Sequence, residues 1–298
     1  MTRRQLAAYL VICAIWGSTW AAIRIVVTQV PPMEVAAVRF ILAGLLMLPF
    51  IYWRRMTFPQ GRALKVSLIL GVVMIGVQYA LVFTAERYIS SGLTAILYAC
   101  SPLVVGIISP RILGRPVPRA ALTAMLVGVG GLLFLLRSIV STAPSQIVPA
   151  MVMLLAMVIS STCSVYASRE LRDVSAFAAS AVQFLCGGIL LAFCSVLFER
   201  GEPAAWTPSV AAGLFFLIFG GSITAFSLYY WLLKTAEPYR VVTVQFVIPL
   251  IAVTEGTVFL KETIPFLELC GALIVLSAVI LVLRIPSDDD RYLDVTME

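Results

Sequence analysis

Ten apolar runs succeed one another along the chain, separated by short polar or proline-containing segments. A helix that crosses the hydrocarbon core of a bilayer needs about 20 apolar residues. Of the 298 residues, 61% are hydrophobic and 12% are charged, whereas soluble domains average about 25% charged residues. The sequence therefore predicts an all-α integral membrane protein. We expect ten transmembrane helices, at residues 6–28, 32–53, 64–84, 90–110, 117–137, 147–168, 175–198, 209–233, 240–260 and 264–284.

Lysines and arginines outside these runs fall mostly on one side of the predicted bilayer. With the N-terminus in the cytoplasm, fifteen basic residues lie on the cytoplasmic side and four on the other, and Arg24 and Arg39 remain inside spans. Because basic loops stay in the cytoplasm, both termini are predicted to be cytoplasmic. The same bias accounts for the net charge of +6, so no nucleic-acid partner is needed to explain it.

The second half of the sequence repeats the first. At an offset of 144 residues, 38–48 (VRFILAGLLML) aligns with 182–192 (VQFLCGGILLA), and at an offset of 147 residues, 101–136 aligns with 248–283 without a gap. Each half then holds five spans, and an odd number forces the second half to insert upside down. Inverted repeats of this kind build transporters with a binding site near the bilayer midplane. The predicted divisions are 1–137 and 147–284 for the repeats, 138–146 for a linker and 285–298 for a cytoplasmic polar tail.

An aromatic stripe marks the first span. Trp16, Trp20 and Arg24 lie four residues apart, so a helix places them on one face. Trp16 falls near mid-bilayer, where anchoring at the membrane interface explains a tryptophan poorly. We interpret the stripe as the lining of a cavity; helix packing beside the small residue Gly17 is the alternative.

Other spans carry polar and aromatic residues at similar depth, and Gln78 and Gln245 stand out because a buried amide without a partner is costly. The predicted cavity residues are Trp16, Trp20, Gln78, Tyr79, Phe83, Tyr98, Ser101, Ser160, Ser164, Tyr229, Tyr230 and Gln245. Such a pocket is aromatic and mostly uncharged. It suits an apolar or aromatic metabolite, or a zwitterion, and not a sugar phosphate, which would want paired basic residues at mid-membrane.

Three charged residues fall inside predicted spans, namely Arg24, Arg39 and Glu255, all in the outer third of the bilayer. Intramembrane charges are expensive and point to function. We expect Glu255 to pair with Arg39 or Arg24 as an outer gate, or to carry a coupling proton. The alternative is static: the arginines extend to the interface and Glu255 faces a water-filled space on the outer side.

Several kinds of chemistry have no support in the sequence. There is no histidine, which removes imidazole metal sites and histidine-based catalysis. The six cysteines all fall within spans, at positions 13, 100, 163, 186, 194 and 270, and are expected to pack as small apolar residues. No phosphate-binding loop is present. Glu255 alone does not supply the paired groups that an enzyme would need. We expect no metal, no cofactor and no enzymatic activity.

The chain resembles the drug/metabolite transporter superfamily, and within it the ten-helix EamA-type permeases, from about residue 6 to 284. The matching segments are WGSTWAAIRI (16–25), PPMEVAAVRFILAG (31–44), SSGLTAILYACSPL (90–103), IPLIAVTEGTVFLKE (248–262) and Gly271. The resemblance implies a plasma-membrane carrier, commonly an exporter of amino acids or other small metabolites. It also implies a cavity lined by spans 1, 3, 4, 6, 8 and 9. One departure is Arg115, where such proteins often carry an acidic residue matching Glu262; we interpret it as a loop difference.

Together these features predict a secondary transporter that works by alternating access around a midplane cavity, exporting small metabolites such as aromatic or apolar amino acids. A lipid or polyprenyl-lipid translocase on the same fold is the alternative. The expected partners are a small-molecule substrate and the lipid bilayer of the inner membrane. The sequence leaves the driving force open between a proton and facilitated diffusion, and the oligomeric state open between a monomer and a homodimer.

Overall fold

The computed structural model is helical throughout the part of the chain that it describes. The described residues are 1–89, 94, 97–98, 101–114, 118–136, 147–251, 270, 273–274, 277–278 and 280–281. The helices in this part are α1 (Arg3–Val27), α2 (Pro32–Trp53), α3 (Gly61–Leu70), the π-helix η1 (Gly71–Val77), α4 (Gln78–Glu86), α6 (Ser101–Leu113), α7 (Arg119–Leu136), α8 (Ile147–Glu170), α9 (Ala176–Phe198), α10 (Pro208–Phe216), the π-helix η3 (Leu217–Thr224), α11 (Ala225–Thr235) and α12 (Pro238–Val241).

Six helical segments among the described residues are long and apolar enough to cross a membrane. They are Arg3–Val27, Pro32–Trp53, Gly61–Glu86, Ile147–Glu170, Ala176–Phe198 and Pro208–Thr235. Each of their ends lies within three residues of a predicted span. The prediction of an all-α membrane protein is therefore confirmed. Of the other predicted spans, 117–137 corresponds to α7, whereas 90–110, 240–260 and 264–284 fall wholly or partly on residues outside the described ranges, as does the tail 285–298.

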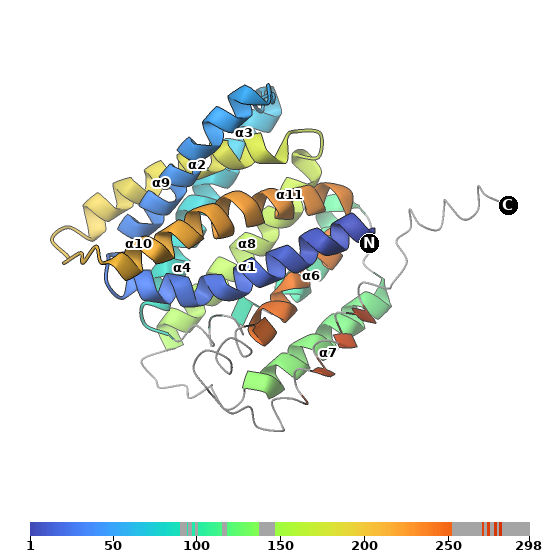
Figure 1. The fold of residues 1–298 in the computed structure, drawn as a ribbon. Helices are drawn as coiled ribbons and strands as arrows, with labels where there is room; N and C mark the ends of the chain where they lie inside the picture. Colours follow the sequence, from blue (N-terminus) through green and yellow to red (C-terminus); the bar gives the residue numbers. More distant parts are fainter. Residues whose placement is uncertain are drawn as a thin grey trace.

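Helices α2 and α9 pack side by side along their lengths (Figure 1). A Cβ placed on Gly44 of α2 would lie 2.7 Å from the Leu185 side chain of α9, and a Cβ placed on Gly188 of α9 would lie 2.8 Å from the Ile41 side chain of α2. Both pairs are related by 144 residues, since Gly44 corresponds to Gly188 and Ile41 to Leu185. A glycine of α2 thus packs against an aliphatic side chain of α9, and the corresponding glycine of α9 packs against the corresponding aliphatic side chain of α2.

Helix α9 also meets η1 at very close range. A Cβ on Gly187 would clash with the carbonyl oxygen of Gly71 and would lie 2.5 Å from Cβ of Ile75. A Cβ on Gly76 would lie 2.6 Å from the Leu190 side chain. Small residues let membrane helices approach in this way, because the gain comes from van der Waals contact between backbones.

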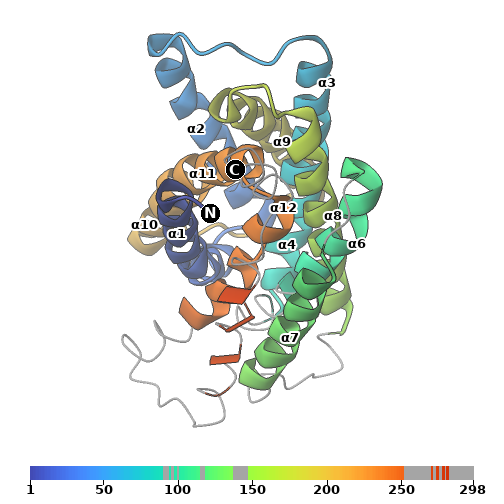
Figure 2. The same cartoon turned by 90° about the vertical axis from the view of Figure 1, so that its right-hand side faces the viewer.

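The third and eighth predicted spans each change from α-helix to π-helix and back. Residues Gly71–Val77 form η1, and residues Leu217–Thr224 form η3. At the offset of 147 residues, 71–77 falls on 218–224, which lies inside η3. π-helical stretches are rare and frequently occur at functional sites. Figure 2 shows α4, which follows η1, and α11, which follows η3, on the inner side of the bundle.

Candidate functional site

A small cavity lies inside the bundle between helices of both halves of the chain. Its volume is about 60 Å³, and one water occupies about 30 Å³ in the liquid. The described lining comes from α1, α2, η1, α4, α8, α11 and residues 97–98 and 244–251. It consists of Trp16, Thr19, Trp20, Ile23, Arg39, Met74, Gln78, Tyr79, Val82, Tyr98, Ser160, Ser164, Phe226, Tyr229, Gln245 and Ile248. A metabolite can therefore enter only if these walls move apart.

Nine of the twelve residues predicted to line a cavity meet at this place. They are Trp16, Trp20, Gln78, Tyr79, Tyr98, Ser160, Ser164, Tyr229 and Gln245. The stripe on the first span faces the cavity because α1 packs against α11, η3 and α4 on that side. Trp16 is fixed there by a hydrogen bond from its Nε1 to the carbonyl oxygen of Gly221, at 3.3 Å.

Aromatic rings form most of the wall. The Trp16 ring lies 5.5 Å from that of Phe226 and 5.0 Å from that of Tyr229, and the Trp20 ring lies 5.2 Å from that of Tyr98, between centroids. Ring pairs at such distances contribute about 0.5–1.5 kcal/mol beyond the area that they bury. The wall is therefore firmly packed and offers ring faces to an apolar or aromatic solute.

Three predicted cavity residues are buried but are not part of the lining. Phe83 lies one turn beyond Tyr79 on α4, toward the far end of the helix, with the two ring centroids 6.0 Å apart. Tyr230 points to α9, where its hydroxyl donates to Oε1 of Gln183 at 2.6 Å. Ser101 begins α6, three residues after Tyr98. The predicted depth of a residue in the bilayer does not show whether its side chain faces the cavity or a neighbouring helix.

Arg39 was predicted at an outer gate, but its side chain lines the cavity. It is 1% exposed, and its Nε donates a hydrogen bond to Oγ of Ser222 at 2.9 Å. The guanidinium carbon lies 4.8 Å from the ring centroid of Phe40 and 5.3 Å from that of Tyr79. The described lining is therefore mostly uncharged, as expected, but it includes one cation, because a long side chain on α2 reaches across to η3.

Glu86, at the end of α4, is a buried carboxylate that was not among the predicted site residues. It is fully buried, and neither of its carboxylate oxygens has a hydrogen-bond partner among the described residues. The charges that act on it are those of Arg24 and Arg39. Arg24 also donates a hydrogen bond to the backbone carbonyl of Glu86. Glu255, the predicted partner of the arginines, lies outside the described residues.

Several polar atoms at the cavity have no hydrogen-bond partner in the part of the chain that the structure describes. Among lining residues in the described part, the buried atoms of this kind are Trp20 Nε1, Arg39 Nη1, Gln78 Oε1 and Gln245 Oε1. The Gln78 side chain is held in place by a hydrogen bond from its Nε2 to the Tyr98 hydroxyl. Because an unsatisfied buried polar group is costly, these atoms are positions at which a bound solute would gain hydrogen bonds.

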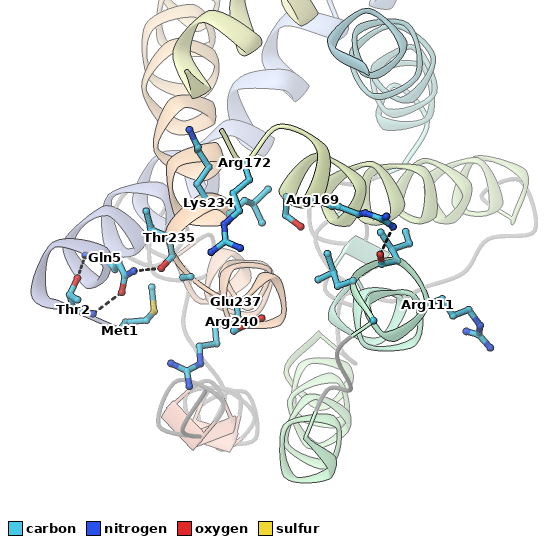
Figure 3. Close-up of a pocket in the computed structure, with 16 residues that line it drawn as sticks. Met1, Thr2, Gln5, Arg111, Arg169, Arg172, Lys234, Thr235, Glu237 and Arg240 are labelled. Atoms are coloured by element: carbon cyan, nitrogen blue, oxygen red, sulfur yellow. Dashed lines mark hydrogen bonds between the residues drawn. The ribbon is translucent and has the colours of Figure 1, made fainter. Parts of the chain in front are cut away.

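A much larger hollow, the vestibule, opens on the side of the molecule where α1 begins. Its volume is about 1110 Å³. Basic side chains surround it (Figure 3). The described lining is Met1, Thr2, Gln5, Arg111, Ile112, Leu113, Gly114, Ser168, Arg169, Arg172, Leu233, Lys234, Thr235, Ala236, Glu237 and Arg240. Five of these side chains are cationic and one is anionic, so the vestibule favours anions.

A thin layer separates the vestibule from the cavity. Tyr9 lies on α1 between Gln5 of the vestibule and Trp16 of the cavity. Its hydroxyl is 3.0 Å from Oγ1 of Thr243, and the Thr243 hydroxyl donates to the carbonyl oxygen of Arg240 at 2.6 Å. The single hydroxyl hydrogen of Thr243 is thus used, so Tyr9 is the donor to Thr243.

The opposite side of the molecule, where α1 ends and α2 begins, is tied together by contacts between the two halves. The carboxylate of Glu199 accepts hydrogen bonds from the backbone N–H groups of Met33 and Glu34, at 2.7 and 3.0 Å. Arg87 forms an ion pair with Glu202, with an N–O distance of 2.6 Å, and this hydrogen bond raises the pKa of Arg87 above its ordinary value. These contacts hold the two halves of the chain together on this side.

The sequence matches one family model across both halves, the EamA-like transporter family, at residues 5–137 and 148–284. The chain belongs to the EamA-like transporter family. It is a membrane transporter of the drug/metabolite type and a multi-pass inner membrane protein.

Relatives of this EamA-like transporter align over most of both chains. The inner membrane transporter YedA of Escherichia coli K12 is 30% identical over 271 residues, which cover 90% of this chain and 87% of that protein. Protein PecM of Dickeya dadantii is 25% identical and covers 90% of this chain and 88% of its own. A solved crystal structure that is 19% identical covers 94% of this chain and 96% of its own with a TM-score of 0.79, which supports the same fold.

Proposed function

We propose that this EamA-like transporter exports small metabolites, such as aromatic or apolar amino acids, by alternating access. The observation that carries the proposal is the small, aromatic cavity between helices of both halves, with a wide vestibule on one side and cross-half contacts on the other. Opening one side while closing the other moves a bound solute across the membrane without an open channel.

An arrangement of ten transmembrane helices as two inverted repeats, 1–137 and 147–284, belongs to this proposal. It is supported by the contact between Gly44 and Leu185, which recurs as the contact between Gly188 and Ile41. The corresponding π-helices η1 and η3 support it as well, and so do the two matches of the family model. Transporters built from inverted repeats reorient by rocking one bundle against the other around a fixed midplane site.

The side on which the vestibule lies agrees with the proposed export. With both termini in the cytoplasm, as the distribution of basic residues favours, the vestibule opens to the cytoplasm. Among the described residues, the halves are held together on the outer side, and the layer around Tyr9 and Thr243 lies between the cavity and the vestibule. Such a state can load solutes from inside the cell, as an exporter must.

The proposal is tested by ligand-dependent thermal stability of the purified protein in detergent. A ligand that binds the native state raises its melting temperature. We expect a shift with aromatic or apolar amino acids and none with sugar phosphates. In Trp16→Ala the affinity should fall about tenfold, because losing a packed aromatic contact costs about 1–1.5 kcal/mol. Trp53→Ala is the matched control, since Trp53 is 72% exposed at the end of α2, and it should bind as the wild type does.

Two outcomes would contradict the proposal. If Trp53→Ala weakened binding as much as Trp16→Ala, the cavity would not be the binding site. If no soluble solute shifted the melting temperature while a polyprenyl-lipid did, the protein would be a lipid translocase.

The layer between vestibule and cavity gives a further prediction. Tyr9→Phe removes the hydrogen bond to Thr243 and should make the cavity open more often on the vestibule side. A buried hydrogen bond contributes about 1 kcal/mol net, which corresponds to about a fivefold change in the opening equilibrium. Cys13 lies one turn beyond Tyr9 and is 1% exposed. Its alkylation by a maleimide, followed by peptide mass spectrometry, should be about fivefold faster.

Tyr52→Phe is the control for this measurement, because Tyr52 is 88% exposed on α2. Its Cys13 alkylation rate should equal that of the wild type. An unchanged rate in Tyr9→Phe would mean that the Tyr9–Thr243 contact does not limit opening.

A further inference from the structure

Arg39 is held in place through only part of its hydrogen-bonding capacity. Nε is used by Ser222, and the planar group lies over the rings of Phe40 and Tyr79. A Cβ on Gly221 would lie 3.0 Å from Nη2 of Arg39, so this glycine leaves the space that the guanidinium occupies. Nη1 has no partner within the described part of the chain. The side chain is therefore positioned, and one of its donor nitrogens is left available.

Glu86 is the buried carboxyl that lies near Arg24 and Arg39, and it does not occupy the donors of Arg39. The two groups interact electrostatically, but no hydrogen bond between them is present, and both oxygens of Glu86 are without partners among the described residues. A carboxylate that served only as the structural counter-ion of Arg39 would be expected to form the paired hydrogen bonds that arginine favours. Nη1 has no such bond to any described residue, so it is open to a carboxylate, whether that of a bound solute or that of Glu255, which lies outside the described residues.

A second open donor lies in the same lining. Trp20 is 8% exposed, and its Nε1 has no partner in the described residues, although its neighbour on the stripe, Trp16, uses the equivalent atom to bind Gly221. Indole nitrogen can only donate a hydrogen bond, and so can guanidinium nitrogen. The groups that satisfy both are acceptors, and a planar carboxylate is the best match to a guanidinium.

The open acceptors of the cavity are complementary to these donors. Gln78 is 3% exposed and donates from its Nε2 to Tyr98, which leaves its Oε1 open. Oε1 of Gln245 also has no partner among the described residues. An ammonium group has three N–H donors and no acceptor, so amide oxygens can bind it, whereas the donors of Arg39 and Trp20 cannot.

We propose that Arg39, with Trp20, binds the carboxylate of the transported solute, and that Gln78 and Gln245 receive an ammonium group where the solute carries one. This inference rests on the proposed function and deepens it, because it requires a carboxylate on the substrate and makes Arg39 the residue that selects for it. The aromatic wall formed by Trp16, Phe226 and Tyr229 would then hold the side chain.

The vestibule is consistent with this selection. A solute entering from that side passes five cationic side chains and one anionic one. A mouth with one sign of charge raises the local concentration of solutes of the opposite sign. Anionic analogues should accordingly bind faster at low ionic strength.

The test compares three probes that share a phenyl group: L-phenylalanine, 3-phenylpropionate and 2-phenylethylamine. Their binding to the purified full-length protein is measured by isothermal titration, and the same series is repeated with leucine, 4-methylpentanoate and isoamylamine. We expect the acids and the amino acids to bind the wild type at least tenfold more tightly than the amines. This comparison needs no variant.

Variants then assign the preference to Arg39. In Arg39→Gln the acids should bind at least tenfold more weakly, and their advantage over the amines should disappear. Arg39→Lys keeps the charge but lacks the planar pair of donors, so it should retain part of the preference for acids over amines. It also serves as the second variant where Arg39→Gln impairs folding. Arg54→Gln, an exposed change at the end of the same helix, is the matched control and should leave all affinities unchanged.

Each remaining outcome overturns the proposal in a distinguishable way. Amines that bind the wild type as tightly as the acids would overturn the role of Arg39 and leave the proposed transport of aromatic and apolar solutes standing. Equal loss of acid and amine binding in Arg39→Gln would assign Arg39 a structural role only. Failure of every acid and amino acid to bind the wild type would overturn both the inference and the proposed amino acid substrates.

Discussion

Gly187→Ala should strongly destabilise the folded protein. The added Cβ would clash with the carbonyl oxygen of Gly71 and lie 2.5 Å from Cβ of Ile75. Neither atom is the end of a flexible side chain, so α9 and η1 would have to move apart along their contact. Overpacking typically costs 1–3 kcal/mol and occasionally more. We expect about 3 kcal/mol here, because the clash is with backbone.

The measurement is the unfolding midpoint of the purified protein in a denaturing-detergent titration. Gly130→Ala is the matched control, since no atom of the described residues lies within 4 Å of a Cβ at Gly130 on α7 and alanine is about 1 kcal/mol more favourable than glycine within a helix. Gly130→Ala should therefore be as stable as the wild type or more so. If the two variants unfolded at the same midpoint, the α9–η1 approach would be looser than the structure describes.

Glu86→Ala should also cause a large loss of stability, because the Glu86 carboxyl is fully buried and interacts with the charges of Arg24 and Arg39 against the cost of its burial. Removing one member of a buried charge pair costs about 3–5 kcal/mol, since the other charge is left uncompensated. We expect the lower end, about 3 kcal/mol, because no hydrogen bond joins the carboxylate to either arginine among the described residues.

The double variant Arg39→Met/Glu86→Ala tests this explanation directly. Replacing both members of a buried pair with apolar residues is often neutral, so the double variant should be more stable than Glu86→Ala alone. It should also fail to distinguish acids from amines, since Arg39 is gone. A Glu86→Gln protein with the stability of the wild type would contradict the prediction, because it would mean that the Glu86 carboxyl is already neutral in the resting state.

Most of the aromatic and amide residues of the cavity could be predicted from the sequence, whereas the positions of the charged side chains around it could not. Helical spacing and depth placed Trp16 and Trp20 in the wall, and the cost of burying an amide singled out Gln78 and Gln245. Arg39 was interpreted from its depth as part of a gate. Its true position depends on how α2 packs on η3, where Gly221 leaves room for the guanidinium, and a single sequence does not contain that packing.

Other misses have equally concrete causes. Glu86 lies at the end of a span, where a carboxylate is ordinarily solvated, and it is buried only because neighbouring helices close over it. Phe83 and Tyr230 are apolar or aromatic at the right depth, but helix rotation turns them away from the cavity. The sequence gives no indication of the π-helices, because nearly all residues of these spans are apolar and their pattern of hydrophobicity does not reveal the helical periodicity.

Those two π-helices alter how the third and eighth spans can turn. A π-helical stretch takes up an additional residue relative to an α-helix, and each residue of an α-helix corresponds to a rotation of about 100°. Moving the π-helical stretch one residue along the chain would therefore swing the intervening side chains around the helix axis while every backbone hydrogen bond is exchanged for another. η1 directly precedes Gln78, and η3 contains Ser222 and Gly221, which contact Arg39 and Trp16. Each half of the protein thus contains a π-helix at which a span can rotate about its axis, directly beside the groups that face the cavity.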